Sequence, residues 1–126
     1  MFIEYNPNPK TKRVDDCVIR AITKILDIDW DTAFLGVVIV AYAEKNMPSI
    51  NDIWGKYLLS KGFTKHIIPN TCPHCYTVRE FTEEHKEGKY ILATGSHVIA
   101  VVDGDYYDTW DSGDEVPIYY FTRSDV

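Results

Sequence analysis

Three residues whose side chains could together make a cysteine an active nucleophile occur near the two ends of this chain. Cys17 follows the acidic pair Asp15 and Asp16, at the start of a predicted amphipathic helix. His97 and Asp108 lie in the last third of the chain, in a segment typical of a β-hairpin. A thiol at a helix start, an imidazole on a strand and a carboxylate that orients it are the parts of such a nucleophile. The pattern predicts a reaction type but names no substrate.

The register of the hairpin follows from its turn. Asp103-Gly104 is a favoured two-residue type I′ turn, because both central positions of that turn need a positive φ. If these residues form the turn, Val102 pairs with Asp105, and His97 lies opposite Trp110.

Side chains alternate between the two faces of a strand, so this register also predicts which residues share a face. His97, Tyr106, Asp108 and Trp110 are expected on one face, with His97 and Asp108 as diagonal neighbours. Asp111 is expected on the other face, which makes Asp108 the residue that orients the imidazole. A hairpin with a structural edge histidine is the alternative.

Cys17 also has a structural alternative, because free cysteines usually behave as small buried hydrophobic residues. The buried stripe of its helix is already supplied at helical spacing by other side chains, namely Val18, Ala21, Ile22, Ile25 and Leu26. Cys17 itself belongs to the first turn, where Asp15 or Asp16 is expected to cap the free amides. This position favours a nucleophile over a core thiol.

The segment Asp-Cys-Val-Ile-Arg-Ala-Ile at a helix start, with a later histidine strand and an aspartate one hairpin away, resembles the papain-like cysteine peptidase superfamily. The order Cys, His, Asp along the chain matches that superfamily. The resemblance implies that Cys17 is the nucleophile, His97 the general base and Asp108 its orienting residue. The whole chain also resembles short uncharacterised proteins of Gram-positive bacteria and their phages, through Asn-Pro-Asn-Pro-Lys, Cys-Pro-x-Cys-Tyr-Thr-Val and Tyr-Tyr-Asp-Thr-Trp-Asp-Ser-Gly.

The sequence departs from the papain-like pattern at the oxyanion donor. Papain-like enzymes often place a glutamine ahead of the cysteine, and this chain contains no glutamine. Asn8, acting with the backbone amide of Cys17, is the candidate donor pair. The alternative is that Asn6-Pro7-Asn8-Pro9 is only a turn.

Cys72-Pro73-His74-Cys75 is the second cysteine motif of the chain. It is interpreted first as a structural turn that holds an oxidisable thiol pair. A zinc site is the second interpretation, with His66, His74 or His85 completing the ligands Cys72 and Cys75. Thiol-redox catalysis is the third, although no βαβ pattern surrounds the motif.

Composition excludes several classes of function. The chain has 13 basic and 19 acidic residues and a net charge of −6, which argues against a nucleic-acid ligand. The longest apolar run, 33–43, is too short to span a bilayer, and the first residues turn polar at once, so neither a membrane span nor a signal peptide is expected. Three cysteines, an odd number, indicate a cytoplasmic protein rather than a disulfide scaffold. No cofactor is expected.

The remaining patterns predict a single domain over 1–126. Helices are expected from Asp29 or Asp31 to about residue 46, from Asn51 to Gly62, and from Thr77 to about His85. Strands are expected at 63–68, 90–93, 97–102, 105–109 and 117–121. The order of elements predicts an α+β fold of the papain-like kind, with N-terminal helices packed on a C-terminal antiparallel sheet.

The predicted function is a cysteine hydrolase that cleaves an amide, isopeptide or thioester bond of a peptide or protein substrate. Trp110 and Tyr106 are expected to frame the substrate cleft beside His97. The first alternative is a catalytically silent binding module of the same fold, for example a phage-encoded inhibitor of a host protein. The second is a thiol-redox or zinc protein centred on Cys72 and Cys75.

Overall fold

The computed structural model describes residues 1–124, which form four helices and six strands. In chain order the elements are β1 (Phe2–Glu4), α1 (Cys17–Leu26), α2 (Trp30–Glu44), α3 (Asn51–Ser60), β2 (Thr64–Ile67), α4 (Val78–Glu84), β3 (Lys89–Ala93), β4 (Val98–Val102), β5 (Asp105–Asp108) and β6 (Tyr119–Thr122). The α+β class is confirmed.

The sheet is mixed, so the expectation of an antiparallel sheet was wrong. Its strand order is β1-β5-β4-β3-β6-β2, and every pair is antiparallel except β1 with β5. Phe2 pairs with Tyr106 in that parallel ladder. A strand of three residues is too short to show a periodicity of two, which explains why β1 was not predicted.

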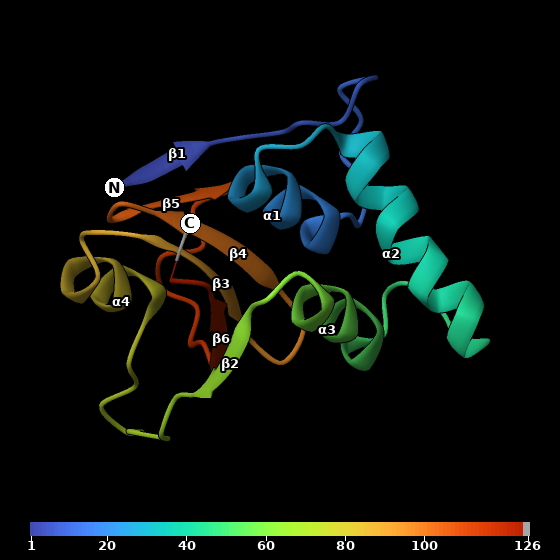
Figure 1. The fold of residues 1–126 in the computed structure, drawn as a ribbon. Helices are drawn as coiled ribbons and strands as arrows, with labels where there is room; N and C mark the ends of the chain where they lie inside the picture. The colour runs from blue at the N-terminus through green and yellow to red at the C-terminus, as the bar shows by residue number, and fades with distance from the viewer. Residues whose placement is uncertain (125–126) are drawn as a thin grey trace.

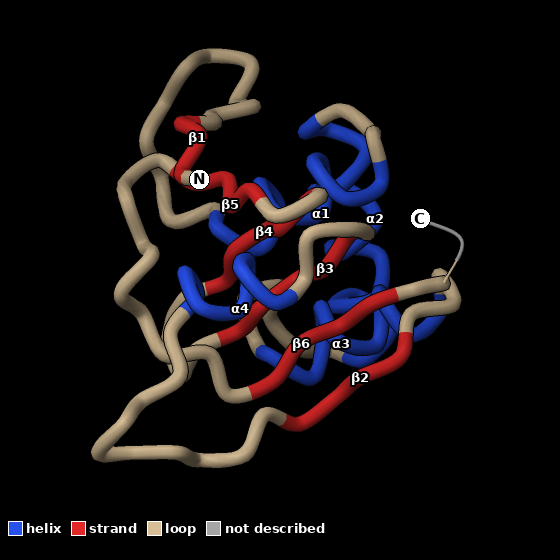
Figure 2. The backbone as a smooth tube through the Cα atoms, turned by 90° about the vertical axis from the view of Figure 1, so that its left-hand side faces the viewer, coloured by secondary structure: helices blue, strands red, loops and turns tan. Residues whose placement is uncertain are grey.

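Helices cover both faces of the sheet (Figures 1 and 2). Helices α1, α2 and α3 lie on one face, and α4 lies alone on the other. The larger core cluster joins the first three helices to the sheet, with Ile22, Trp54 and Phe121 among its buried members. The smaller cluster lies under α4 and includes Phe81 and Tyr106.

Helix α1 is amphipathic, and its buried side faces the sheet. Ile19, Ile22 and Ile25 recur at helical spacing and are almost completely buried. The helix ends at Asp27, which adopts the left-handed conformation that closes many helices. Asp16 occupies the N-cap position, but neither it nor any other side chain caps the helix, so that part of the capping prediction was wrong.

The predictions for α2 and α3 differ in outcome. The side chain of Asp29 accepts a hydrogen bond from the Thr32 amide, which confirms the predicted start of α2. Asn51 is the first residue of α3 rather than its cap, and its side chain accepts a bond from Trp54 Nε1 instead. Gly62 follows the helix with a φ of +88°, the left-handed geometry predicted for it.

The central hairpin has the predicted register. Val102 pairs with Asp105 and Val101 with Tyr106. The turn residues Asp103 and Gly104 have φ values of 49° and 84°, as the type I′ turn requires. The turn chemistry of two residues therefore fixed the pairing of β4 with β5.

The start of α4 was also predicted. Thr77 is its N-cap, and the Thr77 hydroxyl accepts a hydrogen bond from the Glu80 amide at 3.2 Å.

Among the described residues, no helix combines the length and apolar character that crossing a membrane would need.

Candidate active site

Three different elements bring Cys17, His97 and Asp108 together. Cys17 is the first residue of α1, His97 directly precedes β4, and Asp108 is the last residue of β5. Helix α1 packs on β4 in the larger core, which sets its first turn beside the strand ends. The hairpin register places the other two side chains against each other, as predicted.

The imidazole of His97 is bound to Asp108 and lines the same pocket as the Cys17 thiol. Its Nε2 lies 2.6 Å from Asp108 Oδ2. Burial alone would lower the pKa of His97, but the hydrogen bonds to Asp108 and to Cys17 outweigh it and raise the pKa to about 9. Because Nε2 is bound to the carboxylate, Nδ1 is the ring nitrogen left for the thiol.

Asp108 is completely buried and fully hydrogen-bonded. Its Oδ1 accepts bonds from the Arg20 guanidinium and the Thr109 amide, both at 2.8 Å. Its Oδ2 accepts from His97 and from the Ser112 hydroxyl, at 2.6 and 2.7 Å. Burial would raise the pKa of Asp108, and the hydrogen bonds from His97 and Ser112, with the backbone amide, reverse this and lower it. The carboxylate is therefore held charged and in a single orientation.

A buried charge network behind the site was not predicted. Arg20 forms ion pairs with Asp16 at 2.7 Å and with Asp108 at 2.8 Å, and all three side chains are almost fully buried. Asp16 also accepts a hydrogen bond from Trp30 Nε1 at 2.9 Å. The guanidinium thus joins the first turn of α1 to the end of β5.

A sequence signal for this network existed. Asp16 and Arg20 have the i,i+4 spacing of a helical ion pair. Arg20 also falls between Ile19 and Ala21, in a buried stretch of α1, and a buried charge requires a partner. Ser112 donates the remaining hydrogen bond to the Asp108 carboxylate. No pattern in the sequence indicates that contact.

Cys17 is a half-buried free thiol that opens onto a pocket of about 450 Å³. His97 lines the same pocket. The first amides of a helix have no acceptor within the helix, and Asp16 does not cap them because its carboxylate is bound to Arg20 and Trp30. The backbone amide of Cys17 is therefore available to a group in the pocket.

Trp110 lies against the imidazole. The two ring centres are 5.1 Å apart, with the planes tilted by 33°. The indole is 47% exposed, so it lies between His97 and solvent at the protein surface. Trp110 was predicted to frame the substrate cleft, but it does not line the pocket beside Cys17. Its role as a cover for the contact between His97 and Asp108 stays a prediction.

Two further predicted site residues are not brought to the pocket. The side chain of Asn8 accepts hydrogen bonds from the amides of Lys10 and Lys12, which is turn chemistry, and Asn8 does not line the pocket. Tyr106 shares the strand face of Asp108, but its ring is buried in the smaller core and its hydroxyl bonds to Asp111. The alternation of side chains along a strand predicts which residues share a face of the sheet. It does not predict which end of that face borders a pocket.

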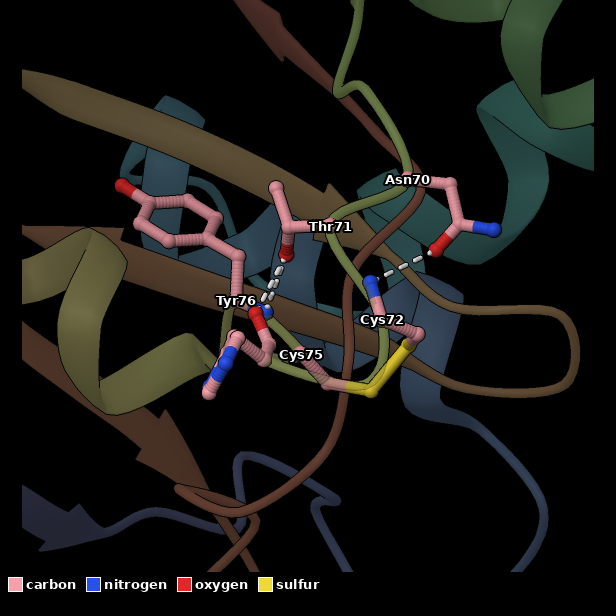
Figure 3. Close-up of a disulfide and its surroundings, with 6 residues drawn as sticks. Asn70, Thr71, Cys72, Cys75 and Tyr76 are labelled. Atoms are coloured by element: carbon pink, nitrogen blue, oxygen red, sulfur yellow. Dashed lines mark hydrogen bonds between the residues drawn. A yellow bond between two sulfur atoms is a disulfide. The ribbon is translucent and has the colours of Figure 1, made fainter.

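Cys72 and Cys75 form a disulfide in the exposed loop before α4 (Figure 3). Asn70 and Thr71 brace the loop, because the Asn70 side chain accepts from the Cys72 amide and the Thr71 hydroxyl accepts from the Tyr76 amide. The first interpretation, a turn that holds an oxidisable thiol pair, agrees with this disulfide. Within residues 1–124 no group of three or more histidine, cysteine or acidic side chains is placed to hold a metal ion.

Comparison with known proteins identifies no relative. No family model, no curated protein and no solved structure matches this chain. The site therefore has to be interpreted from its own geometry.

Proposed function

We propose that this protein is a cysteine-dependent hydrolase that cleaves an amide, isopeptide or thioester bond. The observation that carries the proposal is that Cys17 and His97 line the same pocket, and that His97 Nε2 lies 2.6 Å from the buried carboxylate of Asp108. A nucleophile, a base within hydrogen-bonding reach and a third group that orients the base are the general signature of covalent catalysis.

In the proposed reaction the sulfur of Cys17 attacks the carbonyl carbon as a thiolate, and a carbon–sulfur bond forms. The proton resides on His97, whose raised pKa keeps the imidazole charged at neutral pH. His97 then gives this proton to the leaving amine or thiol as the original acyl bond breaks. Water, deprotonated by His97, attacks the acyl-enzyme, and the carbon–sulfur bond breaks, which releases the carboxylic acid and returns the Cys17 thiolate with the proton on His97.

The oxyanion of the tetrahedral intermediate needs hydrogen-bond donors rather than a particular residue. The uncapped amide of Cys17 at the start of α1 is the donor we assign to it, because the Asp16 carboxylate is turned away toward Arg20 and Trp30. The positive end of the helix dipole adds to this stabilisation.

A papain-like relationship is part of the proposal. Three features support it: the chain order of Cys17, His97 and Asp108, the position of the thiol at a helix start, and helices packed on the sheet beside it. A peptide or protein substrate is the corresponding expectation.

Acylation by p-nitrophenyl acetate tests the hydrolase proposal. The wild-type protein should release p-nitrophenol, gain one acetyl group on Cys17 by mass spectrometry, and then turn over. Cys17→Ala should abolish the acetylation, and Asp108→Asn should slow both steps by roughly 10- to 1,000-fold because His97 loses its orienting partner. Acetylation elsewhere, or of Cys17 at the rate of an ordinary thiol, would contradict the proposal.

The disulfide supports a second candidate function, thiol-disulfide exchange at Cys72 and Cys75. Cys72 is exposed and Cys75 is half-buried. Neither cysteine begins a helix, since α4 starts only at Val78. Catalysis of insulin reduction by dithiothreitol tests this candidate. A rate no faster than dithiothreitol alone would exclude it.

A further inference from the structure

The pocket beside Cys17 is large enough for a substrate side chain. Its volume of about 450 Å³ lies in the range of small-molecule sites. The first turns of α1 and α2, the loop between α2 and α3, and the loop between β3 and β4 enclose it. Its position against Cys17 and His97 means that any bound group lies next to the reacting carbonyl.

One wall of the pocket is aromatic and preformed. Trp30 and Phe34, one turn apart on α2, stack with ring centres 5.0 Å apart and planes 8° from parallel. The hydrogen bond from Trp30 Nε1 to the buried carboxylate of Asp16 fixes the indole. Val18 and Pro48 add apolar surface elsewhere in the lining of the pocket.

The charge of the pocket disfavours an acidic ligand. Asp15 and Asp16 line it, no lysine or arginine among the described residues does, and the cationic imidazole of His97 on its lining is already paired with the Asp108 carboxylate. Both oxygens of Asp16 are already bound, by Arg20 and Trp30. An anionic side chain would meet acidic and apolar groups, whereas an uncharged apolar one would bury its surface against the rings of Trp30 and Phe34.

We infer that the pocket selects substrates in which a large, uncharged apolar or aromatic side chain flanks the reacting carbonyl. This inference rests on the proposed hydrolase function, because it takes Cys17 as the group that reacts. It adds the substrate class, which the three catalytic side chains leave open.

Peptidyl acyloxymethyl ketones test the inference, because the thiolate displaces the carboxylate of such a probe, forming a carbon–sulfur bond as the carbon–oxygen bond breaks. Probes that carry leucine, phenylalanine, alanine or aspartate beside the ketone are compared by their second-order rate of labelling Cys17. The leucine and phenylalanine probes should label roughly 10- to 100-fold faster than the alanine probe, and the aspartate probe slowest. Equal rates, or a faster aspartate probe, would overturn the inference.

Variants assign the preference to the pocket wall. Phe34→Ala should lower the ratio of the phenylalanine rate to the alanine rate severalfold, and this ratio cancels the intrinsic reactivity of the thiol. Leu35→Ala is the matched control, because Leu35 is the next residue of α2, is 56% exposed and does not line the pocket. It should keep the wild-type ratio. An equal loss in both variants would count against the aromatic wall.

Iodoacetamide separates the two possible failures, since it has no side chain for the pocket. Fast iodoacetamide labelling that depends on His97, together with equal rates for the four probes, overturns the substrate class alone. Slow labelling of Cys17 by iodoacetamide and by every probe overturns the hydrolase function, and the substrate class falls with it.

Discussion

At the scale of single residues, the site is defined by how tightly its charges are held. His97 is only 13% exposed, and Asp108 is completely buried. Buried charges persist only when they are paired and hydrogen-bonded. Here each oxygen of the carboxylate has two donors, so the carboxylate holds the imidazole in one orientation.

The raised pKa of His97 predicts a pH-dependent contribution to stability. The pKa is about 9 in the folded protein, above the ordinary 6.5 of an unfolded chain. The protonated ring therefore stabilises the fold fully below about pH 6.5, by roughly 3 kcal/mol, and this contribution is lost as the pH rises through about 9. Urea unfolding of wild type and His97→Gln measures it, and the difference between the two should shrink over that window.

Titration by NMR checks the cause of the shift. Asp108→Asn should lower the pKa of His97 by about one unit or more, because the charged partner is gone. An unchanged pKa in this variant would show that Asp108 does not hold the proton on the ring.

Arg20 is predicted to be the residue whose loss destabilises the network most. Arg20→Met leaves the carboxylates of Asp16 and Asp108 buried without their cation, which should cost about 3–5 kcal/mol of unfolding free energy. Arg20→Lys, which keeps the charge, should lose less.

The pH dependence of the Arg20→Met variant separates charge from packing. Burial raises the pKa of an unpaired carboxylate, so the variant should recover part of its lost stability as the pH falls toward about 4. Chemical unfolding at several pH values measures this. If the difference in unfolding free energy between wild type and Arg20→Met does not change with pH, the lost stability comes from packing and not from charge.

At the scale of elements, the hairpin was the most predictable part of the site. The turn Asp103-Gly104 and a period of two were enough to place His97 beside Asp108. The cap of α4 at Thr77 was predictable for the same reason, because the signal is local and lies within a few residues.

Other features could not be predicted, because they depend on contacts between distant segments. Strand β1 pairs with β5 across almost the whole chain. Asp16 was expected to cap the helix. Its carboxylate instead binds the charged guanidinium of Arg20 and accepts a hydrogen bond from Trp30 Nε1. Asn8 looked like an oxyanion donor, but its turn keeps it out of the pocket.

The turn itself provides a test at this scale. Gly104 has a φ of +84°, and a Cβ there would lie 3.4 Å from Lys86 Cα. Gly104→Ala should therefore lower the unfolding free energy by about 1–2 kcal/mol. Gly95→Ala is the matched control, since a Cβ at Gly95 meets nothing within 4 Å. Thermal or urea unfolding of both variants decides, and equal losses would contradict the predicted turn strain.

At the scale of the whole molecule, the reactive centre and the disulfide belong to different regions. Cys17 lies where α1 meets the strand ends, on the face of the larger core. The Cys72–Cys75 loop precedes α4, which covers the opposite face of the sheet (Figure 1). We expect the two sulfur chemistries to be independent.

The double variant Cys72→Ser/Cys75→Ser tests that independence. Removing a bond that closes so short a loop should cost about 2 kcal/mol or less, and the rate of Cys17 labelling by iodoacetamide should not change. A large change in that rate would show that the loop and the active site are coupled.

Cys17 and His97 are proposed to act as a pair, and the rate of Cys17 alkylation by iodoacetamide measures this pairing. The rate is followed from about pH 4 to about pH 9 in wild type and His97→Ala, with each cysteine identified by peptide mass. Cys17 should react well below neutral pH in wild type, and His97→Ala should abolish this reaction. A Cys17 that follows the profile of an ordinary thiol in both proteins, or stays protected at every pH, would contradict it.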